Sequence, residues 1–261
     1  MHHQAQKALI TGASSGIGAA VARKLAARGV EVWLAARRAD RLALEVQAIE
    51  AAGGRAHAVV FDVTRLQETA AAVVALDQEI GGFDLVLANA GIGGKLTAPS
   101  QTTWEDVQTV FATNVFGALA TLLPVVPLMI ERFAKNGRRG HIAAVSSVAG
   151  ELPLPMAADY GASKAALSFF LEGAQGELPG RGVDVTIIHP GFIKTDLTAK
   201  NKFPMPFLLE PDEAARIIDR GLAARAQFVR FPLGLLGLIG LGKVVPRSVK
   251  NAVVSRNAPR P

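Results

Sequence analysis

Apolar residues follow two alternating patterns along the chain. Short runs rich in valine, isoleucine, leucine and alanine are separated by longer stretches in which apolar residues recur every three or four positions. The short runs are typical of buried strands, and the longer stretches of amphipathic helices. The pattern predicts strands over residues 7–11, 30–35, 56–61, 85–88, 141–145, 183–189 and 228–231, and helices that include 16–28, 40–52 and 65–80.

This alternation indicates βαβ units and therefore a parallel sheet. Right-handed crossovers place helices on both faces, so we expect an α/β fold with a doubly wound parallel sheet, a three-layer α/β/α sandwich of the Rossmann type. No repeat or change of composition marks a second domain, and residues 1–261 are expected to form one domain. Ligands bind such sheets beyond the carboxyl ends of the strands.

The composition agrees with a large buried sheet, since 50% of the residues are hydrophobic and 19% charged. Cysteine is absent, which excludes disulfides, thiolate metal sites and a cysteine nucleophile and fits a reducing compartment. We therefore expect a cytoplasmic protein. The formal net charge is +6, yet the basic residues look scattered, and their one cluster, residues 135–139, is expected to be a solvated loop. Nucleic-acid binding is not expected.

A glycine-rich turn joins the first predicted strand to the first predicted helix. Gly12 permits a tight turn, Gly16 lets backbone amides approach a pyrophosphate, and Gly18 lets the helix pack closely on the strand. The N-terminus of a helix also favours negative charge. This strand–turn–helix setting predicts a dinucleotide site, with candidate ligands Gly12, Ser14, Ser15, Gly16, Ile17 and Gly18.

Two arginines follow the second predicted strand, where an enzyme that uses NAD would offer a carboxylate to the ribose. No acidic residue occurs from Val32 through Ala39, whereas Arg37 and Arg38 suit a 2′-phosphate. The sequence therefore favours NADP(H) over NAD(H). In the alternative interpretation the two arginines merely open the next helix in solvent. Asp62, after the third strand, is a candidate contact for adenine or a cap of the following helix.

The single tyrosine of the chain, Tyr160, precedes Lys164 by four residues in a predicted helix. This spacing puts both side chains on one face. A phenol titrates near pH ~10, so we expect the ammonium of Lys164 to lower the pKa of Tyr160 for proton transfer. Ser146 and Ser147 follow directly on the fifth strand, and a serine hydroxyl there can donate to a substrate carbonyl.

Taken together and in order, these segments make the chain resemble the short-chain dehydrogenase/reductase family in its compact form, over nearly the whole length. The matching segments are Thr11 to Gly18, Asp62-Val63, Ala88-Asn89-Ala90-Gly91, Asn114, Ser147, Tyr160 to Lys164, and Pro190-Gly191 with Thr195. The chain departs from the commonest pattern at Ala88, where the family has asparagine, and at His189, which we interpret as a packed or backbone-bonded group.

The resemblance implies a role for each matching residue. Tyr160 is the general acid/base, Lys164 holds the nicotinamide ribose and lowers the pKa of the phenol, Ser147 orients the carbonyl, and Asn114 anchors a water of a proton relay. On the cofactor side it implies contacts from Asp62, Val63, Asn89, Ala90, Gly91, Pro190, Gly191, Ile193 and Thr195. No metal is implied. Family members pair the helices that would contain Asn114 and Tyr160, so a homodimer or homotetramer is expected.

Two apolar segments bear on the substrate. Residues 192–209 are expected to form a lid, because 203–209 hold no charge; the alternative is a loop that packs on its own helices. The C-terminal extension, residues 228–261, contains an apolar stretch over 231–241 that precedes Lys243, Arg247 and Lys250. It covers the pocket or a subunit interface, or else lies on a membrane surface, and it is shorter than the ~20 apolar residues of a spanning helix.

The leading hypothesis is an NADPH-dependent reductase of a hydrophobic ketone or aldehyde. One alternative is an NAD-dependent alcohol dehydrogenase that works oxidatively. Another, of a different class, is a non-catalytic scaffold that senses the cofactor, although such a protein has no physical reason to keep Asn114, Ser147, Tyr160 and Lys164 together.

Overall fold

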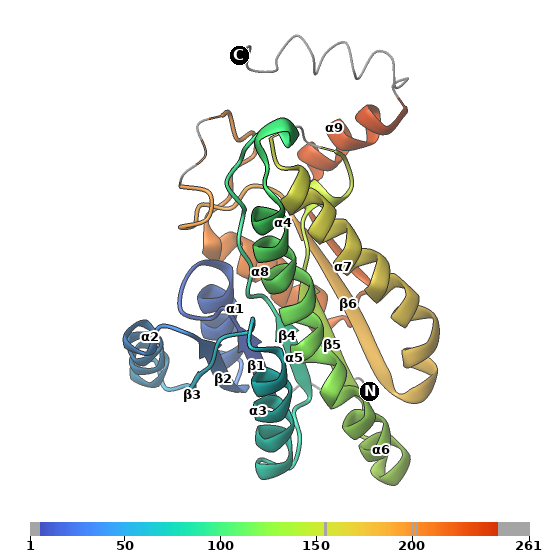
Figure 1. The fold of residues 1–261 in the computed structure, drawn as a ribbon. Helices are drawn as coiled ribbons and strands as arrows, with labels where there is room; N and C mark the ends of the chain where they lie inside the picture. Colours follow the sequence, from blue (N-terminus) through green and yellow to red (C-terminus); the bar gives the residue numbers. More distant parts are fainter. Residues whose placement is uncertain (1–5, 154–155, 200, 202, 245–261) are drawn as a thin grey trace.

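A seven-stranded sheet forms the centre of the molecule (Figure 1), with strands in the order β3-β2-β1-β4-β5-β6-β7 and every pairing parallel. The computed structural model describes residues 6–153, 156–199, 201 and 203–244. The strands are β1 (Lys7–Thr11), β2 (Glu31–Ala36), β3 (Arg55–Val60), β4 (Leu85–Ala88), β5 (Gly140–Val145), β6 (Val183–Pro190) and β7 (Phe228–Phe231). The chain runs outward from β1 to β3 and returns to β4 beside β1, so the predicted doubly wound Rossmann sheet is confirmed.

Helices cover both faces of this sheet. The α-helices are α1 (Gly16–Ala26), α2 (Ala39–Ala51), α3 (Leu66–Glu79), α4 (Trp104–Phe111), α5 (Ala118–Leu122), α6 (Val126–Asn136), α7 (Ala158–Glu177), α8 (Pro211–Ala223) and α9 (Leu233–Val244). One apolar cluster joins α1, α2 and α8 to strand residues such as Ile10 and Leu34. The other joins α3, α5, α6 and α7 to their strand neighbours Leu9 and Ala35. Successive strand residues face opposite layers, as the pleat of a strand requires.

The predicted strands and helices agree with the structure to within two residues at each end. Three strands, 7–11, 85–88 and 228–231, have the predicted bounds. The first helix ends at Ala26 rather than at residue 28 because Gly29, with φ +83°, follows the cap.

The connection from β4 to β5 contains a long, nearly continuous helical segment. It begins as α4, continues as a π-helical turn over Ala112–Gly117 and as α5, passes a 3₁₀ turn over Leu123–Val125, and ends as α6. By length and composition Trp104–Asn136 is the one helix among the described residues that is apolar enough to span a membrane, and half of its most apolar window is buried. Because α5 and α6 pack on the sheet, this segment behaves as the core helix of a globular fold.

The predicted solvated loop at residues 135–139 is wrong for its last two arginines. Arg138 Nε donates to Asp84 Oδ1 at 2.7 Å, and Arg139 Nη2 donates to Asp184 Oδ1 at 2.7 Å. Both carboxylates lie at the amino ends of strands. Asp84 directly precedes β4, and Asp184 is the second residue of β6. The two arginines therefore tie the start of β5 to its neighbours on either side, and the cluster has a structural role.

A buried histidine in β5 predicts how stability depends on pH. The hydroxyl of Thr186 donates to Ala226 O at 2.6 Å, so Nε2 of His141, 2.8 Å away, must donate to Thr186 Oγ1. Burial lowers the pKa of His141 from 6.5 to about 3. Because the unfolded chain takes up this proton near pH ~6.5 and the folded chain does not, we expect the free energy of unfolding to fall by up to ~1.4 kcal/mol per pH unit below that pH.

Urea unfolding of the wild type and of His141→Gln between neutral and acidic pH measures this effect. The side-chain amide of glutamine can donate but does not titrate, so the variant should show a shallower dependence on pH whatever its absolute stability. Parallel curves for the two proteins would contradict the assignment of a neutral His141.

Candidate active site

The glycine-rich turn after β1 lies very close to the backbone of the turn after β4. Gly12 has φ +65°, and a Cβ there would lie 2.7 Å from Ala90 Cα. The side chain of Asn89 closes the turn from the other side, since Nδ2 donates to Thr11 O at 2.9 Å and to Gly12 O at 3.2 Å. A Cβ on Gly18 would collide with the same amide. Asn89 therefore fixes the turn against the end of β4.

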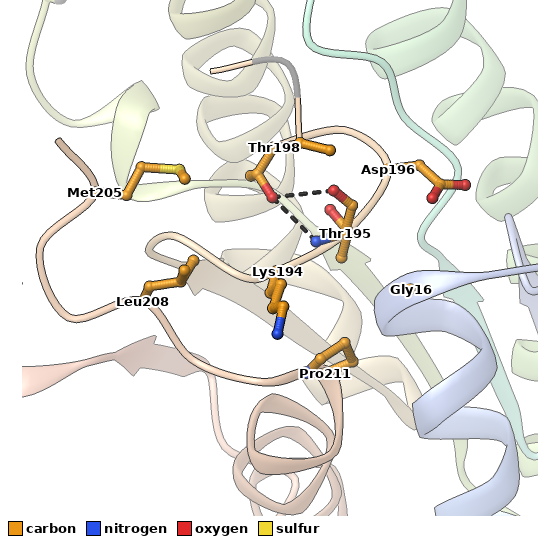
Figure 2. A pocket seen from close by; sticks show the side chains of 9 residues that line it. Gly16, Lys194, Thr195, Asp196, Thr198, Met205, Leu208 and Pro211 are labelled. Carbon is orange, nitrogen blue, oxygen red and sulfur yellow. Dashed lines mark hydrogen bonds between the residues drawn. The ribbon is translucent and has the colours of Figure 1, made fainter. Parts of the chain in front are cut away.

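The N-terminus of α1 is suited to an anion. Its first turn holds no acidic residue, and no side chain caps it, so its backbone N–H groups are available to a phosphate. Two hollows of about 360 Å³ each flank Gly16. Figure 2 shows the first, which Gly16 shares with the segment from Lys194 to Leu208. Neither hollow is lined by Tyr160 or Ser147, so both belong to the cofactor end of the site.

Arg38 lies over the glycine-rich turn. Its Nη2 donates to Ser14 Oγ and to Ser15 Oγ, both at 3.0 Å. Asp196 faces it from the segment after β6, with Oδ2 3.8 Å from Arg38 Nη1 and 3.0 Å from Arg41 Nη1. The guanidinium of Arg38 thus stands at the rim of the turn, held between two serine hydroxyls and a carboxylate.

The sequence analysis missed Arg41 and Asp196. Arg41 is one helical turn after Arg38 in α2, and this spacing was a usable signal. Asp196 is 155 residues from Arg41, and no local pattern brings the two together.

Arg37 and Asp62 lie together at the carboxyl ends of β2 and β3. Arg37 Nη1 is 3.5 Å from Asp62 Oδ2, and the arginine is exposed. Asp62 does not cap α3, whose N-cap is Arg65; its Oδ1 instead accepts from Thr64 N at 3.0 Å. Burial alone would raise the pKa of Asp62, but hydrogen bonds from Thr64 and the charge of Arg37 lower it. Asp62 is therefore an anion whose neighbour, Val63, is buried.

Tyr160, Ser147 and Lys164 come together beside the end of β5. The hydroxyl of Ser147 hydrogen-bonds to Tyr160, and it also accepts from Ala149 N at 3.1 Å. Lys164 is 4% exposed, and its Nζ donates to Val145 O at 2.7 Å and lies 5.9 Å from the centre of the Tyr160 ring. The ammonium thus points into the site rather than into bulk water.

The expected lowering of the tyrosine pKa does not occur in the structure. Burial raises the pKa of Tyr160 above 10, and the hydrogen bond from Ser147 only partly offsets this. Burial also lowers the pKa of Lys164 from 10.5 to about 8. At neutral pH the phenol therefore keeps its proton while Lys164 remains mostly charged.

Asn114 occupies the π-helical turn and is fully buried. Its Oδ1 accepts from Ile92 N at 2.9 Å, while its Nδ2 donates to Ile92 O at 3.0 Å and to Ser163 Oγ at 3.0 Å. A Cβ on Gly91 would lie 3.2 Å from Asn114 Oδ1 and 3.4 Å from Lys164 Nζ. The turn after β4 therefore passes against Asn114 and Lys164 together, which places both beside the end of the central strand.

The segment after β6 completes the edge. Gly191 N donates to Phe231 O at 2.8 Å beyond Pro190, and Ile193 is buried in a bridge to Leu209. A Cβ on Gly16 would lie 3.0 Å from Thr195 Cγ2. Thr195 therefore lies directly against the glycine-rich turn, and both Thr195 and Gly16 line the hollow in Figure 2.

His189 is a packed group rather than a second catalytic base. Its Nε2 is 3.0 Å from Ser168 Oγ and its Nδ1 is 2.8 Å from Glu151 Oε1. Burial lowers the pKa of His189, and Glu151 opposes this shift. Of the two interpretations offered for His189, a packed or a backbone-bonded group, the structure agrees with the packed one, since the side chain is buried and these hydrogen-bond partners are side chains.

The described edge therefore holds all the residues expected from the sequence, brought there by a parallel sheet in which every strand ends on the same side. It can bind the phosphates of a dinucleotide at Gly16 and Arg38 and hold a proton donor at Tyr160. The glycine-rich turn, the N-terminus of α1 and the guanidinium of Arg38 together fit a nicotinamide dinucleotide.

Comparison with known proteins agrees with this geometry. The model of the family described as short chain dehydrogenase matches residues 6–204. An uncharacterized oxidoreductase of Myxococcus xanthus is 45% identical over 249 residues, which cover 95% of this chain and 96% of that protein.

Two solved structures show the same likeness. A metagenomic short-chain oxidoreductase in complex with NADP is 33% identical, covers 86% of this chain and 94% of its own, and has a TM-score of 0.72. The 3-ketoacyl-(acyl-carrier-protein) reductase of Brucella melitensis, complexed with NADH, is 29% identical, covers 84% and 90% of the two chains, and has a TM-score of 0.76. With its Rossmann sheet and the Ser147, Tyr160 and Lys164 arrangement, the chain belongs to the short-chain dehydrogenase/reductase family and is an oxidoreductase of that type.

Proposed function

We propose that this protein is an NADPH-dependent reductase of an apolar ketone or aldehyde. The observation that carries the proposal is the grouping of Tyr160, Ser147 and Lys164 beside Gly91, at the edge that also holds the anion-binding turn. NADPH, when bound, supplies the hydride. The protein supplies a proton at the substrate oxygen and the geometry of the reaction.

The proton step follows from the contacts of Tyr160. The phenol donates its proton to the carbonyl oxygen as a new C–H bond forms at the carbonyl carbon, so the product is an alcohol and the tyrosine is left as a phenolate. Lys164 stabilises this phenolate electrostatically, and Ser147 holds the oxygen in line. Because burial raises the pKa of Tyr160, the phenol carries its proton at neutral pH, as a proton donor must.

Apolar side chains around Ser147 support an apolar substrate. Val148 follows Ser147 directly and clusters with Leu235, against which Leu152, Phe192 and Leu236 pack. Ketoacyl reduction, the activity in the name of the Brucella relative, also acts on a ketone within an acyl chain. We propose that residues 192–209, of which 200 and 202 lie outside the described residues, act as the lid over this cluster.

Exposed aromatic side chains support a homodimer or homotetramer. Phe169 and Phe170 on α7 and Phe116 on the π-helical turn are exposed, and aromatic side chains are enriched at subunit interfaces. Light scattering of the purified protein measures the assembly.

The preference for NADPH is tested at Arg38. We expect Arg38→Gln to weaken NADPH binding by roughly 10- to 100-fold, since a charge-assisted contact to a phosphate is worth about 1.5–3 kcal/mol. NADH lacks the 2′-phosphate, so its affinity should change little. Fluorescence titration of both cofactors measures the two dissociation constants.

Asp196→Asn is the matched control, because it removes the carboxylate that competes for Arg38 and Arg41. It should tighten NADPH binding several-fold, which is the effect expected when one exposed ion pair is removed. The affinity for NADH should not change. Tighter binding of NADH than of NADPH by the wild type would refute the proposed cofactor preference.

A further inference from the structure

Large apolar side chains lie exposed where the lid segment meets α9. Leu197, Phe203, Phe207 and Leu208 of residues 192–209 are exposed, and Leu233 at the start of α9 is 82% exposed. The two segments touch, since a Cβ on Gly234 would lie 2.6 Å from Phe207 Cε1. We call these five side chains the apolar edge. Exposed large apolar side chains on neighbouring segments are typical of a binding surface.

The start of α9 is fixed to the body on one side only. Leu235 is buried and Leu236 partly buried in the cluster beside Ser147, whereas Leu233 and Gly234 remain exposed. Figure 1 shows α9 leaning outward at the carboxyl edge of the sheet, beyond the layer formed by α4 and α7. The contacts of Leu235 thus leave the neighbouring Leu233 facing outward.

The basic and acidic residues are not distributed evenly along the chain, although the basic residues alone look scattered. No acidic residue follows Asp219, so residues 220–261 hold eight of the 28 Lys and Arg residues and no counter-charge of their own. Arg225 and Arg230 are paired with Asp184 and Glu151. From Leu233 onward the sequence has ten uncharged residues and then Lys243, Arg247, Lys250, Arg256 and Arg260. An apolar helix followed by a basic segment is a pattern that suits an anionic lipid surface.

We propose that the apolar edge and the basic C-terminal segment dock this protein on the surface of an anionic phospholipid bilayer. The apolar side chains enter the boundary between headgroups and acyl chains, and the basic residues contact the anionic headgroups. A second copy of the chain fits the same apolar edge less well, because residues 220–261 of each copy carry basic and no acidic residues, and like charges repel. The part of the carboxyl edge beside β7 and α9 then faces the lipid, so an apolar substrate enters from the bilayer.

Flotation of the full chain with vesicles tests the docking. We expect the protein to float with vesicles of phosphatidylcholine and phosphatidylglycerol, to float much less with phosphatidylcholine alone, and to be released by high salt. Leu233→Ser should weaken partitioning by about tenfold, as expected for the loss of one exposed leucine from the lipid boundary. Replacing Lys243, Arg247 and Lys250 by Gln should remove the dependence on phosphatidylglycerol.

Val60→Ser is the matched control. Val60 is exposed on β3, and β3 is the outer strand on the side of the sheet away from β7 and α9. Its partitioning should equal that of the wild type. Failure to float with either vesicle, or equal partitioning of Leu233→Ser and wild type, would overturn the proposal. A loss of oligomeric mass in Leu233→Ser by light scattering would overturn it in favour of a second copy. Binding of NADPH, measured on the same samples, tests the proposed function separately.

Discussion

Replacement of Tyr160 by phenylalanine should lower turnover by about 10³-fold, within the range of 10²–10⁴ that general acid catalysis contributes. Phenylalanine keeps the ring that packs 5.9 Å from Lys164 Nζ and removes only the proton that the carbonyl oxygen receives. The affinity for NADPH should stay nearly unchanged, because the anion-binding turn and Arg38 lie at the other end of the site. Steady-state kinetics and cofactor titration of the same preparation measure both quantities.

Ser146→Ala is a useful comparison for this variant. Ser146 directly precedes Ser147, and its Oγ donates to Lys164 O at 2.9 Å. Its loss should reduce turnover far less than the loss of the phenol. If Tyr160→Phe retained turnover within a few-fold of wild type, the assigned proton donor would be wrong.

Replacement of Lys164 by methionine should lower turnover by roughly 10²-fold or more, since the phenolate that forms on Tyr160 loses its cation. The pH profile is the more specific readout. Burial lowers the pKa of Lys164 to about 8, so reduction by the wild type should decline as pH rises through about 8, where the ammonium loses its proton. In the variant this limb should disappear.

If Lys164 had only a structural role, Lys164→Met would unfold or would keep the decline of activity near pH 8. A lysine whose pKa is lowered on folding opposes folding below that pKa, and this penalty fades as pH rises from about 8 toward 10.5. Methionine removes the penalty, so Lys164→Met is expected to stay folded at neutral pH by thermal unfolding. An unfolded variant, or a variant that keeps the limb near pH 8, would contradict the assignment.

The sequence predicts the sheet well because five of its strands, β1, β2, β4, β5 and β6, are buried at nearly every position. Runs such as Leu85–Ala88 are apolar at every position and bounded by polar or glycine residues, so their limits follow from hydrophobicity alone. The order of the strands follows from right-handed crossovers. The placement of Ser147 and the glycine-rich turn at one edge follows in turn from the parallel sheet.

Features that depend on packing between distant segments could not be predicted. The π-helical turn around Asn114 occurs where Gly117 approaches Val63, with a Cβ on Gly117 lying 2.9 Å from Val63 O. The carboxylate of Asp196 reaches Arg41 only because the segment after β6 folds back over α2. The direction of the Tyr160 pKa shift likewise depends on burial, which neighbouring residues in the sequence do not report.

Transfer of deuterium tests the central claim most directly. NADPH that carries deuterium at both C4 positions is incubated with the wild type and an apolar ketone, and the alcohol is analysed by mass spectrometry. We expect one deuterium on the carbinol carbon of the product from the wild type, and at least ~10²-fold less product from Tyr160→Phe. An alcohol without deuterium, or equal amounts of labelled alcohol from both proteins, would contradict reduction by hydride transfer with Tyr160 as the acid.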